Sequence, residues 1–260
     1  MGASVLAKQD GAIATLTLNR PEAFNAIGLE LAQELTAHVQ SVAADNGVRA
    51  IIITGAGSAF CAGGDLKWTL AYPQGPGAAL RKLAGEVHLA ITEIRRMPKP
   101  VIAAINGVAA GGGFSLALAC DFRVMSREAS LRQAYTSAGL SLDAGGSFML
   151  PRLIGLARAI EVAALDELIS ADRALAWNLV NQVVERSQVE AAAVNLARQL
   201  NLRSLNSFAW SKRLLNDSFE TGLETQMERE REGIATCAQH PDGREGLQAF
   251  QEKRKPRFPA

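Results

Sequence analysis

The sequence predicts an α/β fold that is followed by a helical C-terminal region. Up to about residue 125, short β-branched runs alternate with segments whose apolar residues recur every three or four positions. After about residue 150, nearly every segment has the helical pattern. Strands separated by helices favour parallel pairing, which is typical of an α/β domain.

Four segments of the first half are expected to be strands. Residues 11–19 alternate apolar and polar side chains, as a half-buried strand does. Residues 48–55 form a β-branched run closed by glycine, which is typical of a buried strand. Residues 99–107 and 121–126 are the other two candidates, and only the short run LVNQVVE suggests a strand later in the chain. Two helices are expected between them, one from Ile27 to Val42 and one from Leu80 to Ile94.

Composition narrows the class of protein before any motif is considered. The chain has 260 residues, 48% of them hydrophobic and 20% charged, with a net charge of +1. This balance gives no reason to expect nucleic acid or a membrane as the main partner. The N-terminal segment has no apolar signal core, so we expect a cytoplasmic protein. Three widely spaced cysteines predict neither a disulfide framework nor a zinc site, and no metal is expected.

Two glycine-rich loops are the most informative local feature. The stretch INGVAAGGGFSLALACDF carries Gly111, Gly112 and Gly113 between an apolar run and a segment with a helical pattern. Gly63 and Gly64 follow another apolar run directly before Asp65. Two such loops at neighbouring strand ends can aim two backbone N–H groups at one point, which is the geometry of an oxyanion hole. Close packing between strand and helix is the alternative explanation for the triplet.

The sequence resembles the enoyl-CoA hydratase/isomerase (crotonase) superfamily. The resemblance rests on NRPEAFNAI, ITGAGSAFCAGGDL, KPVIAAINGVAAGGGFSLALACD, GLSLDAGGSFMLPRLIGLARA and GLQAFQEKRKPRF, which extend over nearly the whole chain in the family's order. It implies a crotonase (ClpP-like) spiral of ββα turns with a C-terminal helical trimerisation region. We therefore predict an acyl-CoA-binding core at residues 1–195 and a helical region at 196–260. The implied substrate is an acyl-CoA thioester, without a separate cofactor because CoA is part of the substrate.

The same resemblance assigns roles to individual residues. It makes Gly64 and Gly112 the oxyanion donors for a thioester carbonyl. It places five residues around the CoA adenine and pantetheine: Phe24, Ala26, Ala62, Asp65 and Leu66. Phe250 and Lys253 would close over CoA, from the same or a neighbouring subunit. Core packing remains an alternative for Phe24, Ala26 and Leu66, as do a helix cap for Asp65 and a solvated basic tail for Lys253.

The hydratase pattern is broken in this chain. Hydratases of the family use two glutamates, and the matching positions here hold Ser115 and Tyr135. Neither side chain can replace a carboxylate as a general base near neutral pH. We expect Tyr135 to line the acyl pocket instead, with plain packing as the alternative.

Asp143 is the remaining candidate for proton transfer. It matches an aspartate that shuttles a proton in the isomerase-like branch and attacks the ring in 4-chlorobenzoyl-CoA dehalogenase. His88 falls at the dehalogenase histidine, whereas Tyr135 replaces the tryptophan. His88 is thus a possible catalytic residue, and Asp143 could instead cap the following helix. The interpretation is double-bond isomerisation through Asp143; hydratase-type or dehalogenase-like activity, or acyl-CoA binding without turnover, are the alternatives.

Apolar faces in the C-terminal region predict an oligomer. Val194, Leu196 and Leu200 form one such face, and Phe208, Leu214 and Leu215 form another. Exposed apolar patches of this kind usually mark interfaces. Together with the resemblance, they predict a homotrimer or a hexamer built as a dimer of trimers.

Overall fold

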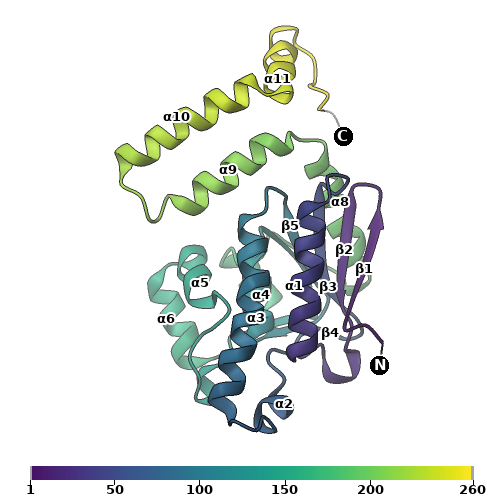
Figure 1. The fold of residues 1–260 in the computed structure, drawn as a ribbon, viewed down its shortest axis with the longest axis vertical. Helices are drawn as coiled ribbons and strands as arrows, with labels where there is room; N and C mark the ends of the chain where they lie inside the picture. The colour runs from purple at the N-terminus through teal and green to yellow at the C-terminus, as the bar shows by residue number, and fades with distance from the viewer. Residues whose placement is uncertain (1, 259–260) are drawn as a thin grey trace.

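The computed structural model describes residues 2–258, which form two sheets with helices packed around them (Figure 1). The larger sheet has the strand order β1-β2-β3-β5-β7-β10. Its first pair is antiparallel, and the other neighbours are parallel. The strands are β1 (Val5–Asp10), β2 (Ile13–Leu18), β3 (Ala50–Gly55), β5 (Val101–Ile105), β7 (Phe122–Ser126) and β10 (Gln182–Val184).

The smaller sheet has the order β4-β6-β8-β9. β4 (Ala59–Cys61), β6 (Val108–Ala110) and β8 (Ser130–Arg132) are parallel neighbours, and β9 (Ile169–Ser170) is antiparallel to β8. The sequence did not predict these four strands or β1. Strands of two or three residues are too short to show a period, and in β1 only Val5 is buried.

The two sheets are built from repeated ββα turns. In β3–β4, β5–β6 and β7–β8, the first strand joins the larger sheet and the second joins the smaller one. A helix then follows each pair: α2 (Leu66–Leu70) with α3 (Pro76–Arg96), α4 (Gly112–Ala119) and α5 (Gly146–Ile154). This repeat confirms the predicted spiral of ββα turns.

Alternating side chains of the larger sheet build two hydrophobic layers. In β3, Ile51 and Ile53 pack with α1 (Leu29–Ala44) and α3, whereas Ala50 and Ile52 face α8 (Val189–Asn201). Val194, Leu196 and Leu200 pack against this second layer. The chain's own sheet thus covers part of these three side chains, and their place in an oligomer face stays a prediction.

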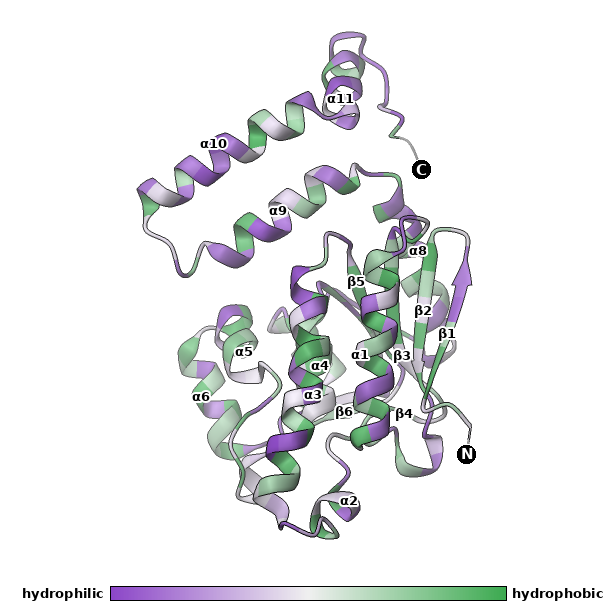
Figure 2. Ribbon diagram, in the orientation of Figure 1, coloured by the Kyte–Doolittle hydropathy of each residue, from purple (hydrophilic) through white to green (hydrophobic). Residues whose placement is uncertain are grey.

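The remaining helices are α6 (Leu156–Leu165), α7 (Ala171–Ala176), α9 (Leu205–Asp217), α10 (Leu223–Gln239) and α11 (Pro241–Gln251), with 3-10 turns at Pro21–Ala23, Thr136–Ala138 and Arg186–Gln188. Figure 1 shows α9, α10 and α11 extending away from the sheets. In Figure 2 the central strands are mostly hydrophobic, whereas α10 and α11 are mostly hydrophilic with isolated hydrophobic positions. The division of the chain at residue 195 stays a prediction, and that residue lies inside α8. Within residues 2–258, no helix combines the length and apolar content needed to cross a membrane.

Candidate active site

The two glycine loops lie at the carboxyl ends of neighbouring strands in the smaller sheet. Gly63 and Gly64 follow β4, and the triplet that begins at Gly111 follows β6. The prediction that they follow neighbouring strand ends is confirmed, although the strands are the short β4 and β6 rather than those of the larger sheet. Parallel strands bring their carboxyl ends to one edge, so the two loops meet there.

Backbone contacts between the two loops explain most of the glycines. A Cβ added to Gly63 would lie 2.9 Å from the carbonyl oxygen of Ala110, and the φ of Gly63 is +101°. A Cβ on Gly113 would lie 2.2 Å from the carbonyl oxygen of Cys61. Close packing therefore accounts for Gly63 and Gly113, and the left-handed φ of +51° accounts for Gly111.

Gly112 differs from its neighbours in the triplet. The nearest atom to a Cβ placed there is the tip of Ile27 at 3.4 Å, and the backbone nitrogen of Gly64 is 4.0 Å away. Packing alone therefore does not require glycine at position 112. The absence of a side chain keeps the space open beside the two backbone N–H groups of Gly64 and Gly112.

Both of these N–H groups are available to a ligand. Ile27 and Gly64 form a parallel bridge in which Ile27 donates to the Gly63 oxygen at 2.7 Å and accepts from Asp65 at 2.9 Å. This pairing directs the N–H of Gly64 away from Ile27. Gly112 is the first residue of α4, so its N–H has no acceptor within the helix. Within residues 2–258 neither N–H donates a hydrogen bond, and the arrangement suits a developing oxyanion.

Asp143 is connected to the same helix. Its carbonyl oxygen accepts a hydrogen bond from the Ser115 hydroxyl at 2.8 Å, and Ser115 lies one turn after Gly112 on α4. Its carboxylate contacts His88 of α3, with 2.7 Å between Oδ1 and Nε2. Both side chains are about half exposed. The alternative role of Asp143 as a helix cap is wrong, because its side chain bonds to His88 and α5 starts at Gly146 without a side-chain cap.

Ser115 and Tyr135, which stand at the positions of the hydratase glutamates, form a hydrogen bond with each other. Their hydroxyl oxygens are 3.2 Å apart, and the Tyr135 hydroxyl also donates to the Asp143 carbonyl at 3.4 Å. Burial raises the pKa of Tyr135 to about 12, even though the Ser115 hydrogen bond favours the phenolate. The pair therefore holds the Asp143 backbone and offers no base near neutral pH.

The residues predicted to surround CoA lie together on a second pairing of loops. Ala62 donates its N–H to the carbonyl oxygen of Phe24 at 3.0 Å, and the Ile27–Gly64 bridge continues this pairing. Ala26 lies between them and accepts from the Arg20 guanidinium at 2.7 Å. Phe24 is 55% exposed and Leu66 is 56% exposed, so core packing does not explain either side chain. Their contact with CoA remains a prediction.

Asp65 has a structural role in the free chain. One carboxylate oxygen accepts from the backbone N–H of Trp68 at 3.1 Å, which caps α2, and the other pairs with Arg20 at 3.0 Å. Burial opposes ionisation, but the Trp68 N–H and the Arg20 guanidinium outweigh it and hold the pKa of Asp65 below its usual value. The role of Arg20 was not predicted, because nothing in the sequence pattern joins it to a residue 45 positions away.

Phe250 and Lys253 are not brought to this site by their own chain. Phe250 is 86% exposed on α11, and Lys253 is exposed just beyond that helix. Figure 1 places α11 at the opposite end of the molecule from α2. Any contact of these residues with CoA at the glycine loops therefore requires a neighbouring copy.

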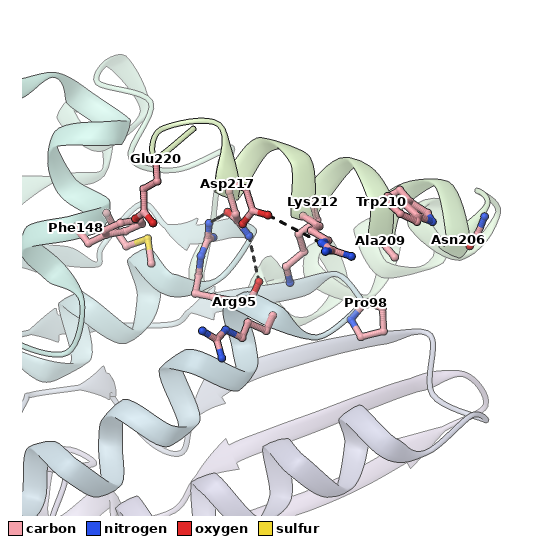
Figure 3. Close-up of a pocket in the computed structure, with 13 residues that line it drawn as sticks. Arg95, Pro98, Phe148, Asn206, Ala209, Trp210, Lys212, Asp217 and Glu220 are labelled. Atoms are coloured by element: carbon pink, nitrogen blue, oxygen red, sulfur yellow. Dashed lines mark hydrogen bonds and ion pairs between the residues drawn. The ribbon is translucent and has the colours of Figure 1, made fainter. Parts of the chain in front are cut away.

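A cavity of about 660 Å³ lies elsewhere, between α3, α5 and α9. Figure 3 shows it with Trp210 and Lys212 of α9 on one side and Arg95 and Pro98 on the other. None of the predicted site residues lines it. Within the described range, no group of three or more His, Cys, Asp or Glu side chains is arranged to hold a metal ion.

Comparisons with known proteins agree with this geometry. The model of the enoyl-CoA hydratase/isomerase family matches residues 8–260. A 1,2-epoxyphenylacetyl-CoA isomerase from Escherichia coli (strain K12) is 36% identical over 255 residues, which are 98% of this chain and 97% of that protein. A probable enoyl-CoA hydratase from Rhodobacter capsulatus is 38% identical over 250 residues, or 95% of this chain and 94% of that protein.

Solved structures give the same result. The crystal structure of an enoyl-CoA hydratase from Polaromonas sp. JS666 matches with a TM-score of 0.93 and 37% identity, covering 98% of this chain and 99% of that one. The chain belongs to the enoyl-CoA hydratase/isomerase family, within the crotonase superfamily. The resemblance stated from the sequence motifs is confirmed.

Proposed function

We propose that the protein isomerises the double bond of an enoyl-CoA thioester, with Asp143 as the proton carrier. The observation that carries this proposal is the hydrogen bonding around Ser115 and Tyr135. Both hydroxyls are engaged with each other and with the Asp143 carbonyl. No pair of carboxylates stands where family hydratases hold a water molecule, whereas one carboxylate lies beside the loops.

The two oxyanion donors would stabilise the enolate intermediate of this reaction. The N–H groups of Gly64 and Gly112 would bind the thioester oxygen as it gains charge, and the positive end of the α4 dipole adds to this. Asp143 removes a proton from one carbon of the acyl chain and returns it to another. A single carboxylate suffices, because no water molecule has to be split.

The tight packing around Ser115 favours an isomerase over a hydratase. Its side chain is fully buried, and its Oγ lies 2.6 Å from where a Cβ on Gly146 would be. A glutamate would not fit at this position without moving α5. The names of the relatives include both reactions, so the residues at these positions are the basis for choosing between them.

The direct test of this proposal is Asp143→Asn. The variant keeps the shape of the side chain and loses the base, so conversion of 3-enoyl-CoA to 2-enoyl-CoA should fall at least about a hundredfold. Binding of the CoA ester should change little. Asp172→Asn is the matched control, since the Asp172 side chain is 79% exposed on the surface, where it pairs with Arg127. Full isomerisation by Asp143→Asn would remove Asp143 from the mechanism.

The His88–Asp143 contact favours one alternative, dehalogenase-like hydrolysis. That chemistry uses an aspartate with a histidine and a tryptophan in the branch that the sequence resembles. Here Tyr135 stands at the tryptophan position and directs its hydroxyl to Ser115 and the Asp143 carbonyl. We therefore expect no chloride release from 4-chlorobenzoyl-CoA, and release coupled to turnover would favour the alternative.

We also propose that the protein works as a homotrimer or hexamer. Leu215, Phe219, Leu223, Met227 and Ile234 are each more than half exposed on α9, α10 and the loop between them. A neighbouring copy would cover such residues and bring Phe250 and Lys253 to CoA. Light scattering at micromolar concentration should give three or six times the chain mass of 27.6 kDa, and a monomer would contradict the proposal.

A further inference from the structure

His88 is the ionisable side chain that contacts the Asp143 carboxylate within residues 2–258. The Nε2–Oδ1 distance is 2.7 Å, and the His88 side chain is 51% exposed. One ring nitrogen thus reaches the carboxylate while part of the ring is open to water. Imidazole ordinarily titrates near neutral pH and has two nitrogens that can each gain or lose a proton.

The backbone of Asp143 is held without the contact with His88. The Asp143 carbonyl oxygen already accepts hydrogen bonds from Ser115, Tyr135 and the Gly146 N–H. Ala144 is buried with a φ of +51°, so the following backbone is also fixed by packing. The Asp143 backbone is therefore fixed without His88, and His88 contacts the carboxylate itself.

We propose that His88 is a proton relay that acts through Asp143, linking the proton taken from the acyl chain to bulk water. This inference rests on the isomerisation proposed above. The other hydroxyls near Asp143 do not suit the role. Ser115 is fully buried, and the Tyr135 hydroxyl, with its pKa of about 12, does not exchange protons as an acid near neutral pH.

The relay moves one proton in each direction. A C–H bond of the substrate breaks, an O–H bond forms on Asp143, and the electron pair goes to the thioester enolate. Beside the ionised carboxylate the ring hydrogen sits on Nε2, so once Asp143 is protonated the ring first exchanges to the Nδ1–H tautomer, with water giving a proton to Nδ1 and taking the one from Nε2. The O–H bond then breaks as an N–H bond forms at Nε2, and Nδ1 releases its proton to water. The steps reverse to reload Asp143, and because the exposed ring exchanges its N–H protons, the returned proton carries the isotope of the solvent. No oxidant or reductant is involved.

Isomerisation in deuterated water separates a relay from a structural contact. His88→Gln keeps an amide N–H that can reach the Asp143 carboxylate but cannot pass a proton. We expect this variant to convert 3-enoyl-CoA while the deuterium content of the 2-enoyl-CoA product, measured by mass spectrometry, falls severalfold below that of the wild type. In His88→Ala, added imidazole should restore the deuterium content. His38→Gln is the control, since His38 lies on α1 away from Asp143.

The outcomes are distinguishable from failure of the proposed function. If His88→Gln lowers the rate but its product is as deuterated as that of the wild type, His88 only positions Asp143 and the relay is wrong. Unchanged rate and unchanged deuterium content would also overturn it, with the isomerase proposal intact. If the wild type does not isomerise 3-enoyl-CoA at all, both proposals fail together.

Discussion

The glycine loops are held by close backbone packing, whereas the C-terminal helices are joined to the core by a few side-chain contacts. At the ends of β4 and β6, the backbones approach so closely that a Cβ on Gly113 would clash with Cys61. By contrast, α9 is joined to the core through the buried Lys212 and through stacking of Phe208 on Phe122, while α10 and α11 expose apolar residues. One chain thus brings the N–H groups of Gly64 and Gly112 together by itself, whereas its exposed apolar C-terminal surfaces fit the oligomer that we propose.

The largest effect is expected within the glycine triplet. Gly113→Ala should prevent folding, because its Cβ would lie 2.2 Å from the Cys61 carbonyl oxygen. Gly112→Val should fold, since its nearest neighbour is the movable tip of Ile27, but the side chain would displace the thioester oxygen. Loss of one donor costs about 2.7–4 kcal/mol in the barrier, or at least about a hundredfold in turnover. Circular dichroism and steady-state kinetics check both; unchanged activity in Gly112→Val would remove Gly112 from the site.

The second effect concerns the attachment of α9 to the core. Lys212 donates to the carbonyl oxygens of Ile94 and Lys99 and to Asp121 at 2.7 Å. Burial lowers the pKa of Lys212, and the Asp121 carboxylate opposes that shift. Lys212→Met should destabilise the protein by about 3 kcal/mol, because Asp121 loses its buried partner. Denaturant unfolding measures this, with the exposed Arg213→Ala expected to change stability by less than about 0.5 kcal/mol.

A smaller effect tests whether Asp65 is structural. The pKa of Asp65 is lowered in the folded chain, so its ionised carboxylate stabilises the fold above the pKa of about 3.9 that it has in the unfolded chain. This stabilisation is lost as the pH falls through the pKa of the folded chain. At pH 7, Asp65→Asn should lower the free energy of unfolding by about 1 kcal/mol. Below about pH 4, acidification should then reduce the stability of the variant by less than it reduces that of the wild type. Unfolding at pH 7 and pH 3, with the exposed Asp10→Asn as control, checks this. An unchanged acid dependence would contradict the structural role.

The smallest effect is expected at the C-terminus. If Lys253 reaches a CoA phosphate from a neighbouring copy, Lys253→Ala should weaken CoA binding by up to about fivefold at low salt. The loss should shrink as salt rises, because the contact is screened. Titration calorimetry at two salt concentrations measures it, and Lys255→Ala is the matched control. Identical dissociation constants for Lys253→Ala and the wild type would show that Lys253 belongs to a solvated tail and does not contact CoA.

The sequence predicted those parts of the site that depend on residue type. Glycines at two strand ends were visible without coordinates, and the family resemblance pointed to Asp143. The order of the strands that carry them was not, since β4, β6 and β8 each have three residues and show no period. The contact of the apolar face of α8 with the chain's own sheet was not predicted, because sequence periodicity does not say which surface covers a face.

Contacts between distant positions were also beyond the sequence. His88 and Asp143 are 55 residues apart, and their 2.7 Å contact depends on how α3 packs beside the loop before α5. Motif spacing identified Ser115 and Tyr135 as replacements for glutamates but not their hydrogen bond to each other. The two residues that replace the glutamates thus hold the backbone of Asp143.

The measurement that tests the central claim most directly is the product distribution of the wild type. Purified protein is incubated with 3-enoyl-CoA and, separately, with 2-enoyl-CoA, and the CoA esters are followed by liquid chromatography and mass spectrometry. With Asp143 as the proton carrier and no glutamate pair, the first substrate should give 2-enoyl-CoA, and the second should give little or no 3-hydroxyacyl-CoA. Rapid formation of 3-hydroxyacyl-CoA from 2-enoyl-CoA, without migration of the double bond, would contradict the account.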